Sequence, residues 1–370
     1  MEKQIDSNRM TTNSWSDTLY TAGVIASKDI TEALKNPRLL INIIMALGLV
    51  VFFYFMLTLR PFDKDIEVLV VGAVGPDLPM GSQELADGYQ ITLYSVDSLE
   101  QMSRNLGYRE LGVMVPPDFQ QTLAKGDEVV LTGYIPWSKR SKVSELEAQY
   151  SQNFSELLGG PVRIVIGDNI VKPPYNGIGA EQAAAFHLLL AILYMAVIVV
   201  PNLMLEEKST RTLEVLFVSP ASSAQIVLGK ALAGLFFVAI SAGLAFTLNQ
   251  MYVIDWGLAL LVGVLSAIFS TLLALALGAL LKSPVQMGLW SLVLMLVLML
   301  PGWFIHEPFL ASGLKTVISF IPTSALALLF GYAASVGAPA SLIIKNLAIA
   351  SGYAVLLFGL VVWRVRRADR

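Results

Sequence analysis

Few residues of this chain have the types and spacings that carry out covalent chemistry. The chain of 370 residues has no cysteine, which excludes disulfides, thiolate metal sites and a cysteine nucleophile. Its two histidines, His187 and His306, lie far apart, so a histidine-rich metal site is not expected. A phosphate loop is absent, because Gly229 and Lys230 lack both the earlier glycine and the following hydroxyl. We therefore expect no cofactor on this chain and no ATP hydrolysis by that machinery.

The most distinctive polar stretch is a charged segment that joins two long apolar runs. If residues 206–218 are helical, Glu207 and Arg211 stand four apart and Arg211 and Glu214 three apart, which supports a surface helix electrostatically. Pro220 favours an end to that helix. Two interpretations stay open, a docking element for a partner protein or a solvated loop whose charges set orientation. The apolar side chains on the other side of the helix are Leu213, Leu216 and Phe217.

Composition places the whole chain in a membrane. Hydrophobic residues make up 55%, charged residues 14%, and the mean hydropathy is +0.65. These values predict an α-helical polytopic membrane protein and exclude an ordinary soluble one. The first span reads as retained rather than as a cleaved signal peptide, and we expect no nucleic-acid partner. Six apolar runs predict transmembrane helices at 39–59, 183–204, 226–248, 257–281, 286–305 and 341–363.

Residues 60–182 predict an extracytoplasmic α/β domain with its linker, inserted between the first two spans. Within 61–180 there are 9 Lys/Arg against 16 Asp/Glu, so the insert is acidic. Strands are predicted to alternate with helices, and about 120 residues are enough to bury a core. We expect strands at 66–71, 91–94, 111–115, 129–135 and 162–166, and helices at 99–106, 118–125 and 142–158.

Two further membrane segments are ambiguous. Residues 1–38 form a polar N-terminus with an amphipathic helix that could lie in the interface plane or pack on a partner. Its expected apolar stripe comprises Trp15, Leu19, Ala22, Ala26, Ile30 and Ala33. Residues 307–335 are interrupted by Lys315 and Pro322, and each half is too short to cross, which favours a re-entrant or interfacial segment.

Charge asymmetry predicts the topology. With six spans, both termini lie on the side that carries most Lys and Arg, including the basic tail 364–370. That side is the cytoplasm of a multi-pass protein in the cytoplasmic membrane. His187 and Asn202 in the second span are candidates for a transport path, although a neutral histidine hydrogen-bonded near the interface fits His187 as well.

The charged segment resembles the cytoplasmic coupling segment of ABC exporter permeases of the second type, and is especially similar to the sodium-extrusion and drug-efflux branch. The resemblance rests on the run Glu206-Glu207-Lys208, the run 211–216 (RTLEVL), Ser219-Pro220 and Gly229-Lys230. It extends to Lys28-Asp29 with Asn36-Pro37-Arg38 before the first span, to 114–119 with Lys125-Gly126 in the insert, and to 321–324. In relatives an arginine often follows that last stretch, where this chain has Gly331.

The resemblance implies an ATP-driven exporter permease that pairs with a second copy or a sister permease. ATP and Mg would bind separate ATP-binding cassette subunits, and a coupling helix at 205–220 would dock on them. The contacts to the ATPase would come from Glu206, Glu207, Lys208, Arg211, Leu213, Glu214, Leu216 and Phe217. Two alternatives remain, a mechanotransmitting subunit acting on an external partner, and an intramembrane receptor or enzyme with an external sensor domain. Nothing selects an ion, drug or lipid-like substrate.

Overall fold

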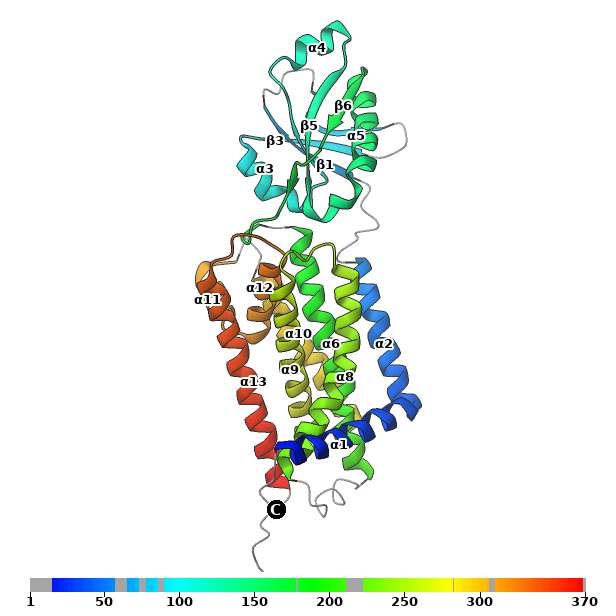
Figure 1. Ribbon diagram of the computed structural model, residues 1–370, viewed down its shortest axis with the longest axis vertical. Coiled ribbons are helices and arrows are strands. Elements are labelled where there is room, and N and C mark those ends of the chain that lie inside the picture. The colour runs from blue at the N-terminus through cyan, green and yellow to red at the C-terminus, as the bar shows by residue number, and fades with distance from the viewer. Residues whose placement is uncertain are drawn as a thin grey trace, which may run out of the picture.

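The protein is a helical bundle with an α/β unit at one end. The computed structural model describes residues 15–56, 65–72, 78–85, 90–177, 179–210, 222–281, 283–305 and 310–368. Among these residues, six helices are long and apolar enough to cross a membrane, as the apolar runs predict, and they run side by side in Figure 1. They are α2 (Pro37–Tyr54), α6 (Ala180–Thr210), α8 (Ser223–Asn249), α9 (Trp256–Leu280), α10 (Pro284–Phe304) and α13 (Ala340–Ala368).

Local capping signals set where these helices begin. The Asn36 side chain accepts from the Arg38 backbone N–H at 3.0 Å, and Pro37 takes the first helical position, where no N–H is needed. Helix α2 therefore begins before the predicted residue 39, and residues 57–59 of the predicted span lie outside the described residues. A capping box between Ser222 and Gln225 begins α8 in the same way.

Helix α6 is the centre of the bundle. In the most apolar part of α6, 83% of the residues are buried inside the protein, whereas the corresponding share is 22% for both α10 and α13. The outer helices keep large apolar side chains exposed, such as Leu289 on α10 and Leu356 on α13. An apolar surface of this kind is the one that contacts lipid.

The predicted interruption at 307–335 is a bent helix pair. Helix α11 (Ser312–Ile318) and helix α12 (Pro322–Ala333) meet at 100°, which is the geometry of a broken span or a re-entrant loop. Pro322 begins α12, as expected, whereas Lys315 lies inside α11 and does not interrupt it. Nearly all of α12 is buried, so its backbone is shielded by neighbouring helices.

The α/β unit contains a seven-stranded mixed sheet. The strand order is β2-β3-β1-β4-β5-β6, with β7 paired to β5, and all five predicted strands and three predicted helices are present. Two short strands were not predicted, β2 and β7. The strands are β1 (Asp65–Val71), β2 (Gly81–Glu84), β3 (Gln90–Val96), β4 (Leu111–Met114), β5 (Val129–Pro136), β6 (Val162–Val165) and β7 (Ile170–Val171).

Helices cover both faces of this sheet. Helix α5 (Val143–Leu158) and helix α4 (Phe119–Lys125) contribute to the larger core, through side chains such as Tyr150 and Phe154. The other face packs against α3 (Leu99–Asn105) and the 3₁₀ helix η2 (Leu106–Tyr108). There Met102 lies over Gly112, where a Cβ would be 2.1 Å from the Met102 sulfur, so a larger residue would require Met102 to move.

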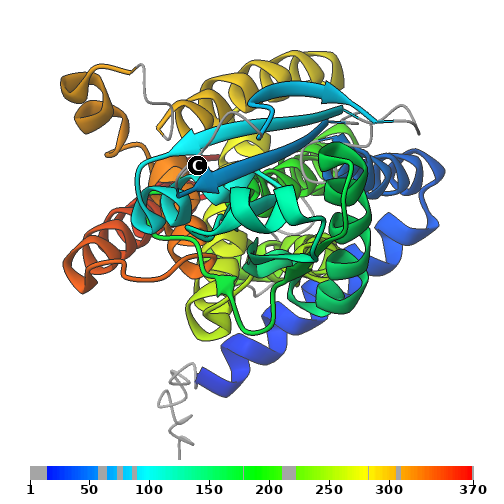
Figure 2. The ribbon, with the colours of Figure 1, turned by 90° about the horizontal axis from the view of Figure 1, so that it is seen from above.

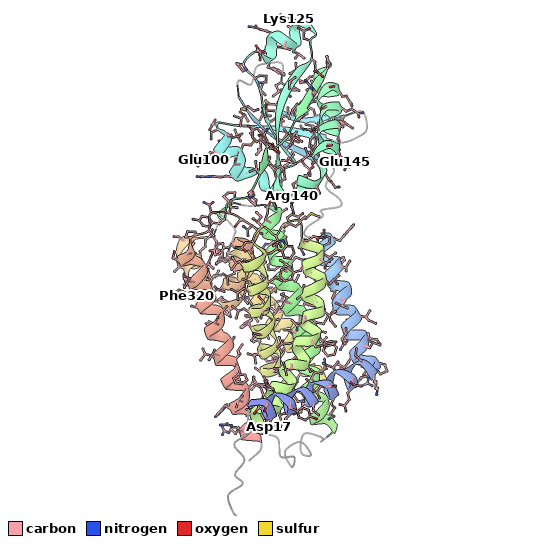
Figure 3. The ribbon with its side chains drawn as sticks, viewed as in Figure 1. Asp17, Glu100, Lys125, Arg140, Glu145 and Phe320 are labelled. Atoms are coloured by element: carbon pink, nitrogen blue, oxygen red, sulfur yellow. The ribbon has the colours of Figure 1, made fainter. Side chains whose placement is uncertain are left out.

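The α/β unit lies over the ends of the spans and is tied to them (Figures 1 and 2). Arg140, in the 3₁₀ helix η3 (Trp137–Lys142), donates to the Met251 carbonyl between α8 and α9 at 2.8 Å. It is labelled at this boundary in Figure 3. The chain that returns to α6 pairs with the connector before α13, since the Val336 N–H donates to the Pro173 carbonyl at 2.9 Å. The returning chain is thus held by the bundle at Pro173 and Tyr175.

Candidate coupling site

The predicted coupling segment is described only at its two ends. Helix α6 continues without a break to Thr210, so Glu206, Glu207 and Lys208 form its last turns. The predicted coupling helix at 205–220 is therefore continuous with α6 over residues 205–210. Residues 211–221 lie outside the described residues, which includes Arg211, Leu213, Glu214, Leu216 and Phe217. Helix α8 begins at Ser223, and the ends of α6 and α8 that flank the segment lie at the end of the bundle opposite the α/β unit (Figure 1).

Close packing with neighbouring helices accommodates Pro201 inside helix α6. Proline has no N–H, so the Val197 carbonyl one turn earlier lacks its helical donor. The Ser291 hydroxyl of α10 lies 3.5 Å from that carbonyl. On α9, a Cβ at Gly278 would be 3.0 Å from the Pro201 carbonyl oxygen, so glycine permits the close approach of α9 to α6. Helix α6 continues past residue 204, the predicted end of this span.

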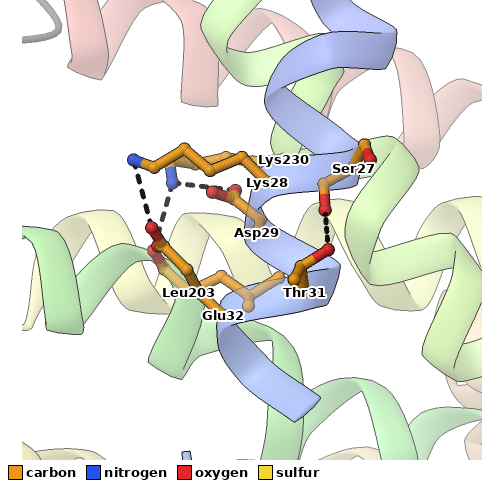
Figure 4. A network of polar contacts seen from close by, with 7 residues as sticks. All are labelled: Ser27, Lys28, Asp29, Thr31, Glu32, Leu203 and Lys230. Carbon is orange, nitrogen blue, oxygen red and sulfur yellow. Dashed lines mark hydrogen bonds and ion pairs between the residues drawn. The ribbon is translucent and has the colours of Figure 1, made fainter. Parts of the chain in front are cut away.

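A buried ion pair lies beside this end of α6. Lys230 of α8 contacts Asp29 of the N-terminal helix α1 (Trp15–Lys35) at 3.2 Å, with their side chains 1% and 5% exposed. The same ammonium donates to the Leu203 carbonyl of α6 at 3.1 Å. One lysine therefore joins α1, α6 and α8, as Figure 4 shows. We call Asp29, Lys230 and Leu203 the junction.

Gly229 explains why α1 can lie so close to α8. A Cβ at this position would be 2.7 Å from the Ile25 Cβ and 3.0 Å from the Ala22 carbonyl oxygen. The pair Gly229-Lys230 thus combines a close helix contact with a buried charge. Lys230 is fully buried in the candidate span Ala224–Asn249. Its position inside an apolar run was the available signal, since such a charge needs a partner.

Helix α1 lies across the ends of the spans in Figure 1 and has three kinds of surface. Ala22, Ala26 and Ala33 are buried, as predicted, and Ile25 joins them. Leu19, predicted for the same stripe, is instead 57% exposed, and the Trp15 side chain lies outside the described residues. Other exposed side chains of α1 are apolar (Tyr20, Val24, Leu34), charged (Asp17, Lys28, Glu32, Lys35) or uncharged and polar (Ser16, Ser27, Thr31). A helix with buried, apolar and charged surfaces suits a position between protein, lipid and water.

His187 lies in a closed contact between three spans. It is fully buried on α6, its Nε2 is 2.8 Å from the Val50 carbonyl of α2, and its Nδ1 is 2.7 Å from the Asn249 amide of α8. Since an amide N–H donates to Nδ1, Nε2–H donates to Val50 and the ring is neutral. This geometry fits the hydrogen-bonded neutral histidine that was one of the two interpretations, and the bundle encloses its ring beside Asn249, the last residue of α8.

Asn202, the other transport-path candidate, donates to the Ile198 carbonyl of its own helix at 2.8 Å. The structure does not bring it together with His187, which bonds to α2 and α8. Across the described part of the chain, no cluster of three or more His, Cys, Asp or Glu could hold a metal ion. The polar groups at the centre of the bundle therefore hold helices together in this arrangement.

Comparison with known proteins identifies the family. A model of the ABC-2 family transporter proteins matches residues 37–363. The chain belongs to the ABC-2 transporter family. A search of curated proteins found no match. An ABC-2 permease is a membrane transport subunit that in general works with an ATP-binding cassette partner, and the six candidate spans fit that role. The match covers the charged segment and Lys230, whereas Asp29 precedes it.

Proposed function

We propose that this chain is the permease subunit of an ATP-driven ABC exporter, which moves an ion, drug or lipid-like substrate out of the cytoplasm. A separate ATPase subunit would bind ATP and Mg, and a second copy or a sister permease would complete the membrane part. The observation that carries the proposal is the junction. It connects the end of α6, which leads into the coupling segment, to α8 and α1 through one buried lysine.

In this mechanism the coupling segment docks on the ATPase. Glu207, Arg211 and Glu214 would make polar contacts, while Leu213, Leu216 and Phe217 would fill an apolar groove. Closure of the ATPases on ATP would shift the last turns of α6. Because Lys230 bonds to both the Leu203 carbonyl and Asp29, α1 and α8 would move with α6 as one body. The differential affinity of ATP for the two arrangements would drive the change.

The proposed orientation places the α1 end of the bundle in the cytoplasm and the α/β unit outside, in the cytoplasmic membrane. The basic tail of α13 and the basic residues that flank α1 support it through the positive-inside rule. The excess of Asp and Glu over Lys and Arg in the insert agrees with a position outside the cytoplasm.

The test is to purify the complex gently through a tag on this chain and to identify what accompanies it. We expect an ATP-binding subunit that is lost when Leu213, Glu214 and Leu216 are replaced together by Ala, Lys and Ala. The matched control replaces Leu99 and Glu100, which are exposed on α3, by Ala and Lys. A clean oligomer without any ATPase would refute the proposal and favour the receptor or enzyme hypothesis.

One observation favours the mechanotransmitting alternative. Arg140 bonds to the Met251 carbonyl while its guanidinium lies 4.3 Å from the Trp137 ring centre, and Val336 pairs with the returning linker. Motion of α8, α9 and α13 would therefore reach the α/β unit directly. In that function, ATP-driven motion acts on an external partner and no substrate crosses the spans.

A further inference from the structure

A cleft separates the base of the α/β unit from the ends of the spans. Its accessible volume is about 510 Å³, within the range of ligand sites, and clefts between domains are common binding places. Ala180, Met251 and Tyr252 form its floor, at the start of α6 and just after α8. Its walls come from β1, η3, α5 and the stretch before β4. Figure 3 labels Glu145 of this wall near Arg140.

Two carboxylates of the walls already have fixed partners. Glu67 pairs with Arg109 at 3.5 Å and accepts from the Tyr94 hydroxyl at 3.2 Å. Glu110 pairs with Lys139 and accepts from the Tyr150 hydroxyl at 3.2 Å. Burial first, and then the neighbouring Glu110, raise the pKa of Tyr150, so its hydroxyl keeps the proton that it donates. These contacts give the cleft rigid walls.

Three charged side chains of the cleft remain for a ligand. They are Asp65 at the start of β1, Lys142 at the end of η3 and Glu145 in the first turn of α5. All three are exposed, and none forms an ion pair with another described residue. A ligand that satisfies them needs an anionic group for Lys142 and a cationic group for the two carboxylates.

The position of the cleft along the direction of the spans indicates the source of that ligand. Ala180 is the first residue of one candidate span, and Met251 follows the last residue of another, Asn249, by two positions. The floor therefore lies where the hydrocarbon region ends and lipid head groups begin. Opposite charges at this height match a zwitterionic head group, which carries a phosphate and an amine.

We propose that this cleft binds the head group of a zwitterionic phospholipid, with its phosphate on Lys142 and its amine on Asp65 and Glu145. The inference goes beyond the proposed function, since it depends neither on ATP coupling nor on the direction of transport. A lipid held here would lie between the α/β unit and the bundle, beside the contact of Arg140 with Met251. It would thus stabilise their relative position.

Native mass spectrometry of the full-length chain, purified in detergent, tests the site. The probes are phosphatidylcholine and phosphatidylglycerol with identical acyl chains, and the readout is the Kd of the first bound lipid. We expect Lys142→Gln and the double variant Asp65→Asn/Glu145→Gln each to weaken phosphatidylcholine about tenfold, the loss of one charge-assisted contact. Lys125→Gln, on α4 at the far tip of the unit in Figure 3, is the matched control and should change nothing.

The two lipids separate a zwitterion site from a simple anion site. The double variant should weaken phosphatidylcholine but not phosphatidylglycerol, which has no amine for the carboxylates. Unchanged phosphatidylcholine binding in both variants would overturn the proposal, as would tighter binding of both lipids in the double variant. Displacement of phosphatidylcholine by equimolar glycerophosphocholine would overturn the assignment to a membrane lipid. Equal thermal midpoints of all variants would exclude misfolding as the cause.

Discussion

Asp29 and Lys230 place two opposite charges in a junction from which water is almost excluded. The pair lies 3.2 Å apart, and each charge is stable there only while the other is present. The Leu203 carbonyl supplies a further acceptor for the ammonium, so the lysine contacts both α1 and α6. The pair therefore specifies how α1, α6 and α8 fit together, beyond any contribution to stability.

Removal of one partner should destabilise the protein. We expect Asp29→Asn or Lys230→Met to lower the stability by about 3–5 kcal/mol, because the remaining charge stays buried without its counter-charge. The double variant Asp29→Leu/Lys230→Met should recover most of this loss, since apolar residues of similar volume replace both charges. Thermal unfolding of the full-length chain in detergent measures both effects.

A second measurement distinguishes a role of the Asp29–Lys230 pair in positioning the helices from a role in stability alone. If the pair positions the helices for coupling, the recovered double variant should bind the ATPase yet lose the link between ATP hydrolysis and transport. Normal coupling in a stable double variant would show that the pair has only a structural role. Lys28, which forms an exposed ion pair with Glu32 on the same helix, gives the control variant Lys28→Met.

His187 should act as a structural residue rather than as part of a transport path. His187→Leu leaves the Val50 carbonyl and the Asn249 amide without their shared partner, so the thermal midpoint should fall. In the complex formed by the folded variant, the substrate-dependent activity of the partner ATPase should persist. Loss of that activity at an unchanged midpoint would instead place His187 on the path.

At the scale of elements, the coupling segment gives the sharpest test. Reversal of one charge by Glu214→Lys should uncouple ATP hydrolysis from transport, because the surface that meets the ATPase would carry the wrong sign. Membrane insertion should be normal, since the segment lies outside the candidate spans. The matched control is Glu100→Lys on α3 of the α/β unit, which should leave coupling intact. Unchanged coupling in Glu214→Lys would contradict the proposed docking role.

The elements that could be predicted are those whose signal is long or strongly patterned. The apolar runs predict the six spans, and β-branched residues flanked by turn-forming residues predict β1 and β5. Strand β2 (GSQE) has no apolar alternation, and β7 has two residues, so both depend on pairing with a neighbour. Tertiary packing also decided the buried side of α1, where Asp29 is inside and Leu19 outside.

The junction could not be derived from the sequence because its parts are distant along the chain. Asp29 and Lys230 are 201 positions apart, and only the packing of α1 on α8 brings them together. Lys230 alone carried a signal, as a charge four residues inside the apolar run 226–248. The cleft under the α/β unit is a similar case, because Met251 and Lys142 meet only once the unit lies on the spans.

At the scale of the whole molecule, the absence of cysteine makes the topology directly testable. Single variants Ser141→Cys in η3 and Ser27→Cys on α1 each introduce one thiol at an exposed position, at opposite ends of the bundle. In intact cells, a membrane-impermeant maleimide should label Ser141→Cys only, because the α/β unit is proposed to lie outside. After lysis both should react. Labelling of Ser27→Cys in intact cells would reverse the proposed orientation.

Removal of the α/β unit distinguishes export from mechanotransmission. Deletion of residues 62–178 leaves the six candidate spans and the junction in place and removes the Arg140 contact with Met251. If the substrate crosses the spans, efflux should persist at a reduced rate and the ATPase should still co-purify, which also reports that the shortened chain folds. Complete loss of efflux with the ATPase retained would favour a subunit whose work is done by the α/β unit, since the spans alone would then move nothing.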